Sequence, residues 1–266
     1  MKFLVRLLVV LAAIAALPAL AQSPPSKPYK ATVATYDRAA ENDAGLAALV
    51  RETRAAVEAK DVAGLSALIS DRFVALDCAA NPLKACAPGK AKAVGAGNAR
   101  PIDRLRLAFC CEGKPSPETP EAAQNDTMFA ILAADLGAGG LGANPDAKGE
   151  VCAPALPRLD RARAGAAARA AGVEPENLRV AAATIPLREK PAPGAATISR
   201  LDPGDPAPMV TALTADTPSG WTAIALPDGA IGYTDALGLD ELTPGAICFG
   251  KEKGRWKIVS TIQRGG

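Results

Sequence analysis

The stretch Gly220–Tyr233, GWTAIALPDGAIGY, decides the fold of the second half of the chain. It opens with a strand over residues 221–224 that starts on the aromatic Trp221, and it returns through a second strand over 231–233. Between the strands lies Asp228-Gly229, a dipeptide favoured in tight hairpin turns because glycine readily adopts a positive φ. The stretch therefore predicts an antiparallel β-hairpin with an aromatic residue near each end.

The sequence around this hairpin has the same β character from about residue 173, with alternation of period two and turns at proline and glycine. This part of the chain contains, in order, a set of apolar, glycine and aromatic residues with one arginine: Leu187, Arg188, Pro191, Ile198, Leu201, Gly204, Val210, Gly220, Trp221, Gly229, Gly232 and Tyr233. In order and spacing, over about 50 residues, this set resembles the bacterial SH3-like domain, a small β-barrel. Thr234 and the long spacer 205–219 depart from the family pattern.

The resemblance implies an SH3-like barrel over residues 181–266, including a C-terminal hairpin that turns at residues 251–254. The hairpin alternates apolar and polar residues, which fits a strand pair with one buried face. The alternation does not decide which of two sheets the hairpin joins. The hairpin either extends the barrel or returns to a sheet of the first half.

Two helices and a strand are predicted at the start of the first half. Asn42 or Asp43 can cap a helix that runs to about Lys60, and Asp61 can cap a shorter one. A strand is expected over residues 72–76. Over about 35 residues this order resembles the start of the nuclear-transport-factor-like cone, an α+β fold with a pocket. The expected fold class is therefore α+β, with an α+β domain over 41–180.

The N-terminus has the pattern of a secretory signal peptide. Lys2 and Arg6 precede an apolar run of eleven residues, and Ala19-Leu20-Ala21 follows as a small-x-small cleavage site. The run is shorter than the roughly 20 residues that span a bilayer, so no stable membrane span is expected after cleavage. We expect residues 1–21 to be removed, a flexible proline-rich leader over 22–40, and a protein that is periplasmic or secreted.

An even number of cysteines in an exported chain predicts disulfides, because the periplasm is oxidising. The six are Cys78, Cys86, Cys110, Cys111, Cys152 and Cys248. Cys78 and Cys86 flank an Asn-Pro turn and are the favoured pair. The adjacent Cys110 and Cys111 are not expected to bond to each other; one is expected to reach Cys152 and the other Cys248. No cysteine pair has the spacing of a zinc site, so no metal is predicted.

Composition excludes several functions. The chain has no histidine, which removes the Ser-His-Asp and Cys-His nucleophilic arrangements and the commonest general base. Loss of Lys2 and Arg6 with the signal peptide would leave 28 basic against 28 acidic side chains. A neutral chain lacks the basic surface that binds nucleic acid. We therefore expect no enzyme, no cofactor and no nucleic-acid partner.

A groove lined by Arg188, Trp221 and Tyr233 is the candidate ligand site, because aromatic faces and an arginine suit extended peptides with carboxylates. The alternative is that Trp221 packs in the barrel core. The expected function is a non-catalytic binding module for peptidoglycan or another envelope protein. A second hypothesis is a small-molecule or weakly catalytic pocket in the first domain, near Asp71 and Asp77, with the barrel as a targeting device. A third is a purely structural envelope subunit.

Overall fold

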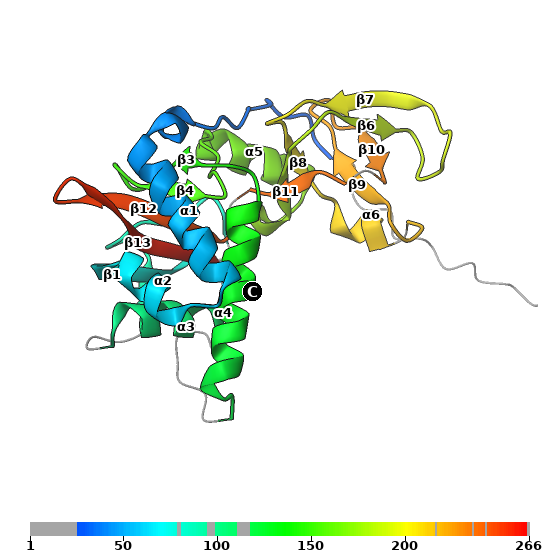
Figure 1. Ribbon diagram of the computed structural model, residues 1–266. Helices are drawn as coiled ribbons and strands as arrows, with labels where there is room; N and C mark the ends of the chain where they lie inside the picture. Colours follow the sequence, from blue (N-terminus) through cyan, green and yellow to red (C-terminus); the bar gives the residue numbers. More distant parts are fainter. Residues whose placement is uncertain are drawn as a thin grey trace, which may run out of the picture.

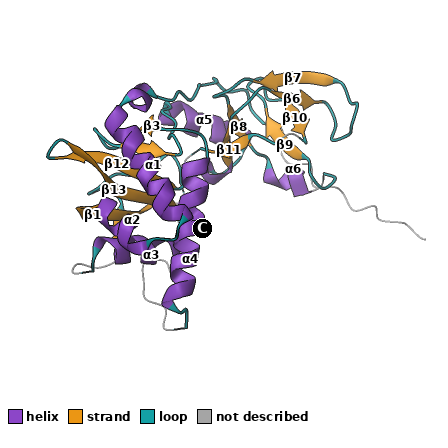
Figure 2. Cartoon of the chain, viewed as in Figure 1, coloured by secondary structure: helices purple, strands orange, loops and turns teal. Residues whose placement is uncertain are grey.

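The computed structural model describes residues 26–78, 81–94, 99–110, 118–215, 217–235, 237–242 and 244–264. The predicted signal peptide and Cys111 lie outside these ranges. Within them helices and several sheets are mixed, which confirms the α+β class (Figure 2). None of the helices in the described ranges is long and apolar enough to cross a membrane.

The helices and strands follow one another in chain order as η1 (Ala39–Asn42), α1 (Ala44–Glu58), α2 (Val62–Leu68), β1 (Ile69–Cys78), β2 (Lys92–Val94), α3 (Pro101–Cys110), α4 (Glu121–Gly137), β3 (Gly142–Ala143), β4 (Val151–Ala153), α5 (Arg161–Ala171), η2 (Pro175–Asn177), β5 (Leu178–Ala181), β6 (Ile185–Arg188), β7 (Thr197–Leu201), β8 (Pro206–Pro208), α6 (Thr211–Ala215), β9 (Thr222–Ala225), β10 (Ile231–Thr234), β11 (Leu239–Glu241), β12 (Ala246–Glu252) and β13 (Arg255–Arg264).

A six-stranded sheet forms the centre of what we call the core unit. Its order is β2-β1-β13-β12-β4-β3. The strands β1 and β13 run parallel, whereas the other neighbours are antiparallel. Parallel neighbours need a long crossover connection. Here that connection spans most of the chain, because β1 and β13 are the first and last named strands of the described residues.

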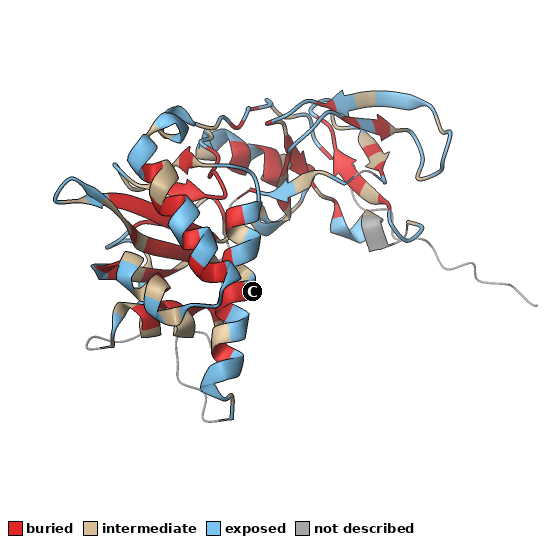
Figure 3. Cartoon of the chain, viewed as in Figure 1, coloured by how far each residue is buried: buried red, intermediate tan, exposed pale blue. Residues whose placement is uncertain are grey.

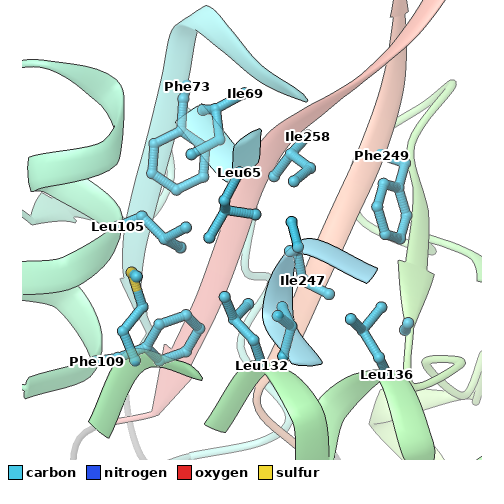
Figure 4. Close-up of a cluster of buried hydrophobic side chains, with 14 of the residues drawn as sticks. Leu65, Ile69, Phe73, Leu105, Phe109, Leu132, Leu136, Ile247, Phe249 and Ile258 are labelled. Atoms are coloured by element: carbon cyan, nitrogen blue, oxygen red, sulfur yellow. The ribbon is translucent and has the colours of Figure 1, made fainter. Parts of the chain in front are cut away.

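Helices α1 to α4 cover one face of this sheet (Figure 1). The carboxylate of Asp43 caps α1 by accepting the backbone N–H groups of Gly45 and Leu46, as N-caps do. Apolar side chains from helices and strands fill the space between the layers, each contributing about 1.5–3 kcal/mol by leaving water. Figure 4 labels ten of them: Leu65, Ile69, Phe73, Leu105, Phe109, Leu132, Leu136, Ile247, Phe249 and Ile258.

Residues 154–245 lie between β4 and β12 in the chain and form what we call the inserted unit. Its strands make a four-stranded sheet, β7-β6-β10-β9, and a three-stranded sheet, β11-β5-β8. A bridge between Met209 and Ile224 links the two sheets. They share an apolar cluster that includes Ile185, Leu187 and Ile224, and α5 packs beside β8.

The C-terminal hairpin belongs to the core unit. It was grouped with the barrel over residues 181–266, with a return to the sheet of the first half left open as the alternative. The structure shows that alternative, since β12 pairs with β4 and β13 pairs with β1. The physical reason is burial on the helix side: Ile247, Phe249 and Ile258 face the apolar layer under α1 to α4. The expected boundary at residue 181 also moves, since α5 and β5 already pack within the inserted unit.

Residues 26–38 are an anchored extended segment, not the flexible leader that was expected over 22–40. The backbone N–H groups of Lys27, Tyr29 and Ala34 donate to carbonyls of the inserted unit. The backbone carbonyl of Asp37 accepts from the N–H of Ala143 in the core unit. Residues 39–42 then form a 3-10 helix. Figure 1 shows the segment as the blue trace that joins the two units.

Two disulfides lie within the described residues. Cys78 bonds to Cys86, which confirms the favoured pair. Cys152 bonds to Cys248, not to Cys110 or Cys111 as expected. The correction has a simple cause: Cys152 and Cys248 are cross-strand partners on β4 and β12, with their Cα atoms 4.0 Å apart. Cys110 is also disulfide-bonded.

Candidate functional site

The three residues of the predicted groove are only partly brought together. Arg188 on β6 and Tyr233 on β10 are cross-strand partners, and both are partly exposed. The Arg188 guanidinium donates to the carbonyl of Ala195 at 2.9 Å, so it holds the β6–β7 turn. Trp221 is 8% exposed, which leaves little of its ring for stacking on a ligand. Its position therefore fits the alternative interpretation, a packing role.

The space between the helices and the sheet of the core unit is filled by side chains. Phe73, Leu105 and Phe249 are among those with less than 2% exposure. The two acids suggested for a pocket do not lie within this layer. Asp71 is exposed, and Asp77 is half-buried. The helix-facing side of the sheet is therefore filled by packed side chains. In the inserted unit, by contrast, β7 and the loop before it are largely exposed (Figure 3).

A cavity of about 500 Å³ lies where the N-terminal segment, the core unit and the inserted unit meet. We call it the junction cavity. Much of its wall is apolar and rigid, because alanines and four prolines line it: Pro154, Pro157, Pro203 and Pro244. The cavity is large enough for a small ligand or a few residues of a peptide.

One polar side of the junction cavity comes from the N-terminal segment. The Arg38 guanidinium lies over the Tyr36 ring, with its central carbon 5.7 Å from the ring centroid. It also contacts Glu41 at 3.1 Å and donates to the carbonyl of Gly139 at 3.1 Å. The charge of Arg38 is therefore already balanced, and its side chain joins the segment to the loop after α4.

A second polar part of the lining is acidic. Asp240 and Glu241 of β11 line the cavity and are exposed. Neither carboxylate has an ion-pair partner among the described residues. Burial raises the pKa of Tyr36, and the carboxylate of Asp240 raises it further, so that hydroxyl stays protonated beside the acids. The arrangement combines an apolar floor with two unpaired negative charges.

Of the residues that line the junction cavity, the sequence analysis named Gly204, as part of the SH3-like pattern, but none of the aromatic or charged ones. Tyr36 and Arg38 fall in the stretch that was expected to be a flexible leader, and Asp240 and Glu241 follow the predicted barrel hairpin. No local motif marks them, because three distant segments build the cavity. Tyr36 and Arg38, near the end of a proline-rich leader that also contains Tyr29, were the available indication.

Glu150, the residue before β4, lies close to the Cys152–Cys248 disulfide. Its carboxylate accepts from Ser260 at 2.9 Å and from Asn144 at 3.1 Å, and burial raises its pKa. Two sulfurs and a carboxylate are metal-binding atoms in principle. Because the two sulfurs are bonded to each other, neither is a thiolate, and the cluster is a structural contact between strands.

Comparison with known proteins gives no relative: no family model, no curated protein and no solved structure matches the chain.

Proposed function

We propose that the chain is an exported envelope protein, periplasmic or secreted, that acts as a non-catalytic binding module for a cell-wall peptide or another envelope protein. The signal-peptide pattern of residues 1–21 supports export. The disulfides Cys78–Cys86 and Cys152–Cys248 also support it, since such bonds persist in oxidising compartments. The lack of histidine favours binding over catalysis.

We infer that the core unit is a nuclear-transport-factor-like cone and the inserted unit a bacterial SH3-like barrel. In support of the cone, two helices lead into β1 and four helices cover one face of a mixed sheet. In support of the barrel, six residues of the family pattern fall on three strands of one sheet: Leu187 and Arg188 on β6, Ile198 and Leu201 on β7, and Gly232 and Tyr233 on β10. Its turn glycines Gly204 and Gly229 have φ of 92° and 89°, which favour glycine.

The ligand we propose for the junction cavity is a peptide that carries a free amine. The observation that carries this proposal is that Asp240 and Glu241, exposed acids without an ion-pair partner among the described residues, line a cavity whose wall also contains four prolines. An ammonium group would pair with a carboxylate of this acidic part of the lining, and the aliphatic part of the residue would cover the prolines. Cell-wall stem peptides contain such an amine before cross-linking, and so do lysine side chains of envelope proteins.

Calorimetric titration with a stem tripeptide ending in meso-diaminopimelate tests the proposal. We expect binding to weaken by about 3- to 10-fold in the double variant Asp240→Asn/Glu241→Gln, since each exposed ion pair contributes about 0.2–1 kcal/mol. Acetylation of the free amine of the tripeptide should weaken binding to the same extent. Added salt should weaken the wild-type interaction and leave that of the double variant nearly unchanged.

Glu189→Gln is the matched control, because Glu189 is an exposed acid on the distant β6–β7 turn. Equal binding of the free and acetylated tripeptides would sink the amine hypothesis. Co-sedimentation with purified cell-wall sacculi separates the two sources of amine. Loss of sedimentation in the double variant favours the wall. Loss in Tyr233→Ala, with the double variant unaffected, would return the site to the face shared with Arg188.

A further inference from the structure

The N-terminal segment lies on the inserted unit in the manner of a bound peptide. The backbone N–H of Lys27 donates to the carbonyl of Ala170 at 2.8 Å, and that of Tyr29 donates to Pro227 at 2.9 Å. Farther along, the N–H of Ala34 donates to Gly204 at 2.8 Å. Main-chain bonds of this kind are how extended peptides gain affinity for a protein surface, while side chains in pockets give specificity.

Burial along the segment also has the pattern of a surface-bound strand. Ser26, Thr32 and Ala34 are 9%, 8% and 4% exposed, while Val33 between the last two is 54% exposed. Tyr29 is the anchor: its hydroxyl donates to the carbonyl of Ala225 at 2.9 Å, and burial raises its pKa. The segment thus holds one side against the inserted unit and leaves the other in solvent.

The surface beneath the segment has glycine at two points of closest approach. A Cβ at Gly204 would lie 2.5 Å from the carbonyl oxygen of Ala34, and one at Gly229 would lie 2.7 Å from that of Ser26. Both glycines have positive φ, so they serve the turns as well. Because these glycines have no side chain, the backbone of another segment can lie directly on the turns.

We propose that residues 26–35 occupy a peptide-binding groove of the inserted unit as an internal ligand, and that the groove accepts an extended peptide with a tyrosine anchor from another chain. The groove runs from the end of α5 past the β9–β10 turn to the β7–β8 turn. Its partner class is an unfolded or extended polypeptide with a Pro-Tyr step, as in Pro28-Tyr29. This inference concerns a surface that adjoins the amine site, because Ala34 and Gly204 also line the junction cavity beside Asp240 and Glu241.

The test cuts the segment free after the protein has folded. A protease recognition sequence is placed between Thr35 and Tyr36 in the mature, oxidised chain. No cysteine lies in residues 22–35, so after cleavage the segment is held by non-covalent contacts alone. The chain also carries Tyr29→Ala, so that the cut copy leaves readily. The probe is a fluorescein-labelled synthetic peptide of residues 26–35 with the natural tyrosine, followed by anisotropy.

We expect saturable one-to-one binding of the probe to the cut protein and at least tenfold weaker binding to the uncut wild-type chain, whose groove is occupied. A probe with alanine at the tyrosine position should bind at least tenfold more weakly to the cut protein. Tyr29→Phe, which loses only the bond to Ala225, replaces Tyr29→Ala in the chain if the latter fails to fold.

Three results would overturn the proposal. The cut protein stays folded by circular dichroism yet does not bind the probe. The probe binds cut and uncut protein equally, which means that it sits elsewhere. Cleavage itself unfolds the inserted unit, which makes the segment an integral strand and not a ligand. Binding of the amine-bearing tripeptide is measured in parallel on the uncut wild-type protein, in which Ala34 still lines the junction cavity, so that failure of the groove and failure of the junction cavity are told apart.

Discussion

Asp43 joins the first helix to the C-terminal hairpin through one carboxylate. Besides capping α1, it accepts from Lys251 Nζ and from Trp256 Nε1, both at 2.9 Å. The hydrogen bond from Lys251, together with the cap and Trp256, lowers the pKa of Asp43 from 3.8 to about 2. A carboxyl whose folded pKa is depressed contributes stability above its unfolded pKa, and that contribution is lost as pH falls.

We therefore expect Asp43→Asn to lower the free energy of unfolding at pH 7, and its deficit against wild type to shrink between about pH 4 and pH 2. Urea denaturation at a series of pH values measures this. Asp61→Asn is the control, because Asp61 caps α2 through Gly64 and has no cation beside it among the described residues. A deficit independent of pH would mean that the cap alone, and not the charge on Lys251, holds Asp43.

Asp135 on α4 has a pKa shifted in the direction opposite to that of Asp43. One of its carboxylate oxygens is buried without a hydrogen-bond partner among the described residues, and burial raises its pKa from 3.8 to about 7. The folded state binds the proton more tightly than the unfolded state does. Stability is then greatest below the unfolded pKa and falls as pH rises from about 4 to 7.

Asp135→Asn should accordingly stabilise the protein at pH 8, by roughly 1–3 kcal/mol after allowance for partial exposure, and flatten the fall in stability between pH 4 and 7. The readout is the urea midpoint at both ends of this range. Asp126→Asn serves as control, since Asp126 lies on the same helix and forms an exposed ion pair with Lys60. Equal slopes in wild type and Asp135→Asn would contradict the assignment.

At the level of elements, the two disulfides close chain loops of very different length. The sulfurs of Cys78 and Cys86 are 8 residues apart in the chain, whereas those of Cys152 and Cys248 are 96 apart and join the ends of the inserted unit. The chain-entropy account gives about 2.5 kcal/mol for the short loop and about 4.7 kcal/mol for the long one. We therefore expect Cys152→Ala/Cys248→Ala to lower the free energy of unfolding more than Cys78→Ala/Cys86→Ala does.

Equilibrium unfolding in urea of the two double variants measures the difference, with the mass of the unreduced protein confirming that the other bond is intact. A larger loss from Cys78→Ala/Cys86→Ala would show that local geometry, not the length of the closed loop, decides the stabilisation.

Sequence patterns gave the elements but not their partners. The candidate caps, Asn42 or Asp43 for the first helix and Asp61 for the second, predicted α1 and α2, because capping signals are local. Alternation in β12 and β13 predicted a hairpin, yet alternation defines a buried face and not the neighbouring strand. The pairing of β13 with β1 therefore stayed open. The junction cavity was beyond reach for the same reason, since Tyr36 and Asp240 meet only through tertiary packing.

At the scale of the whole molecule, the inserted unit is attached through two adjacent strands. Ala153 at the end of β4 is the cross-strand partner of Ile247 in β12. The ends of the insertion are thus already as close as the ends of an ordinary hairpin, and Cys152–Cys248 ties them together. A short loop can replace the insertion without moving either strand, because loop closure costs little for short connections.

We expect a core unit in which two glycines replace residues 158–244, and which starts at Tyr36, to fold by itself. Leu83 needs a polar replacement such as Leu83→Gln, because its methyl group packs near Gly165 of α5 in the intact chain. A dispersed amide NMR spectrum and two intact disulfides, Cys78–Cys86 and Cys152–Cys248, are the expected result. The same chain with Leu83 retained serves as comparison and should aggregate more readily. A collapsed spectrum for the Leu83→Gln form, with scrambled disulfides, would mean that the two units fold as one and that the insertion supplies part of the core sheet's stability.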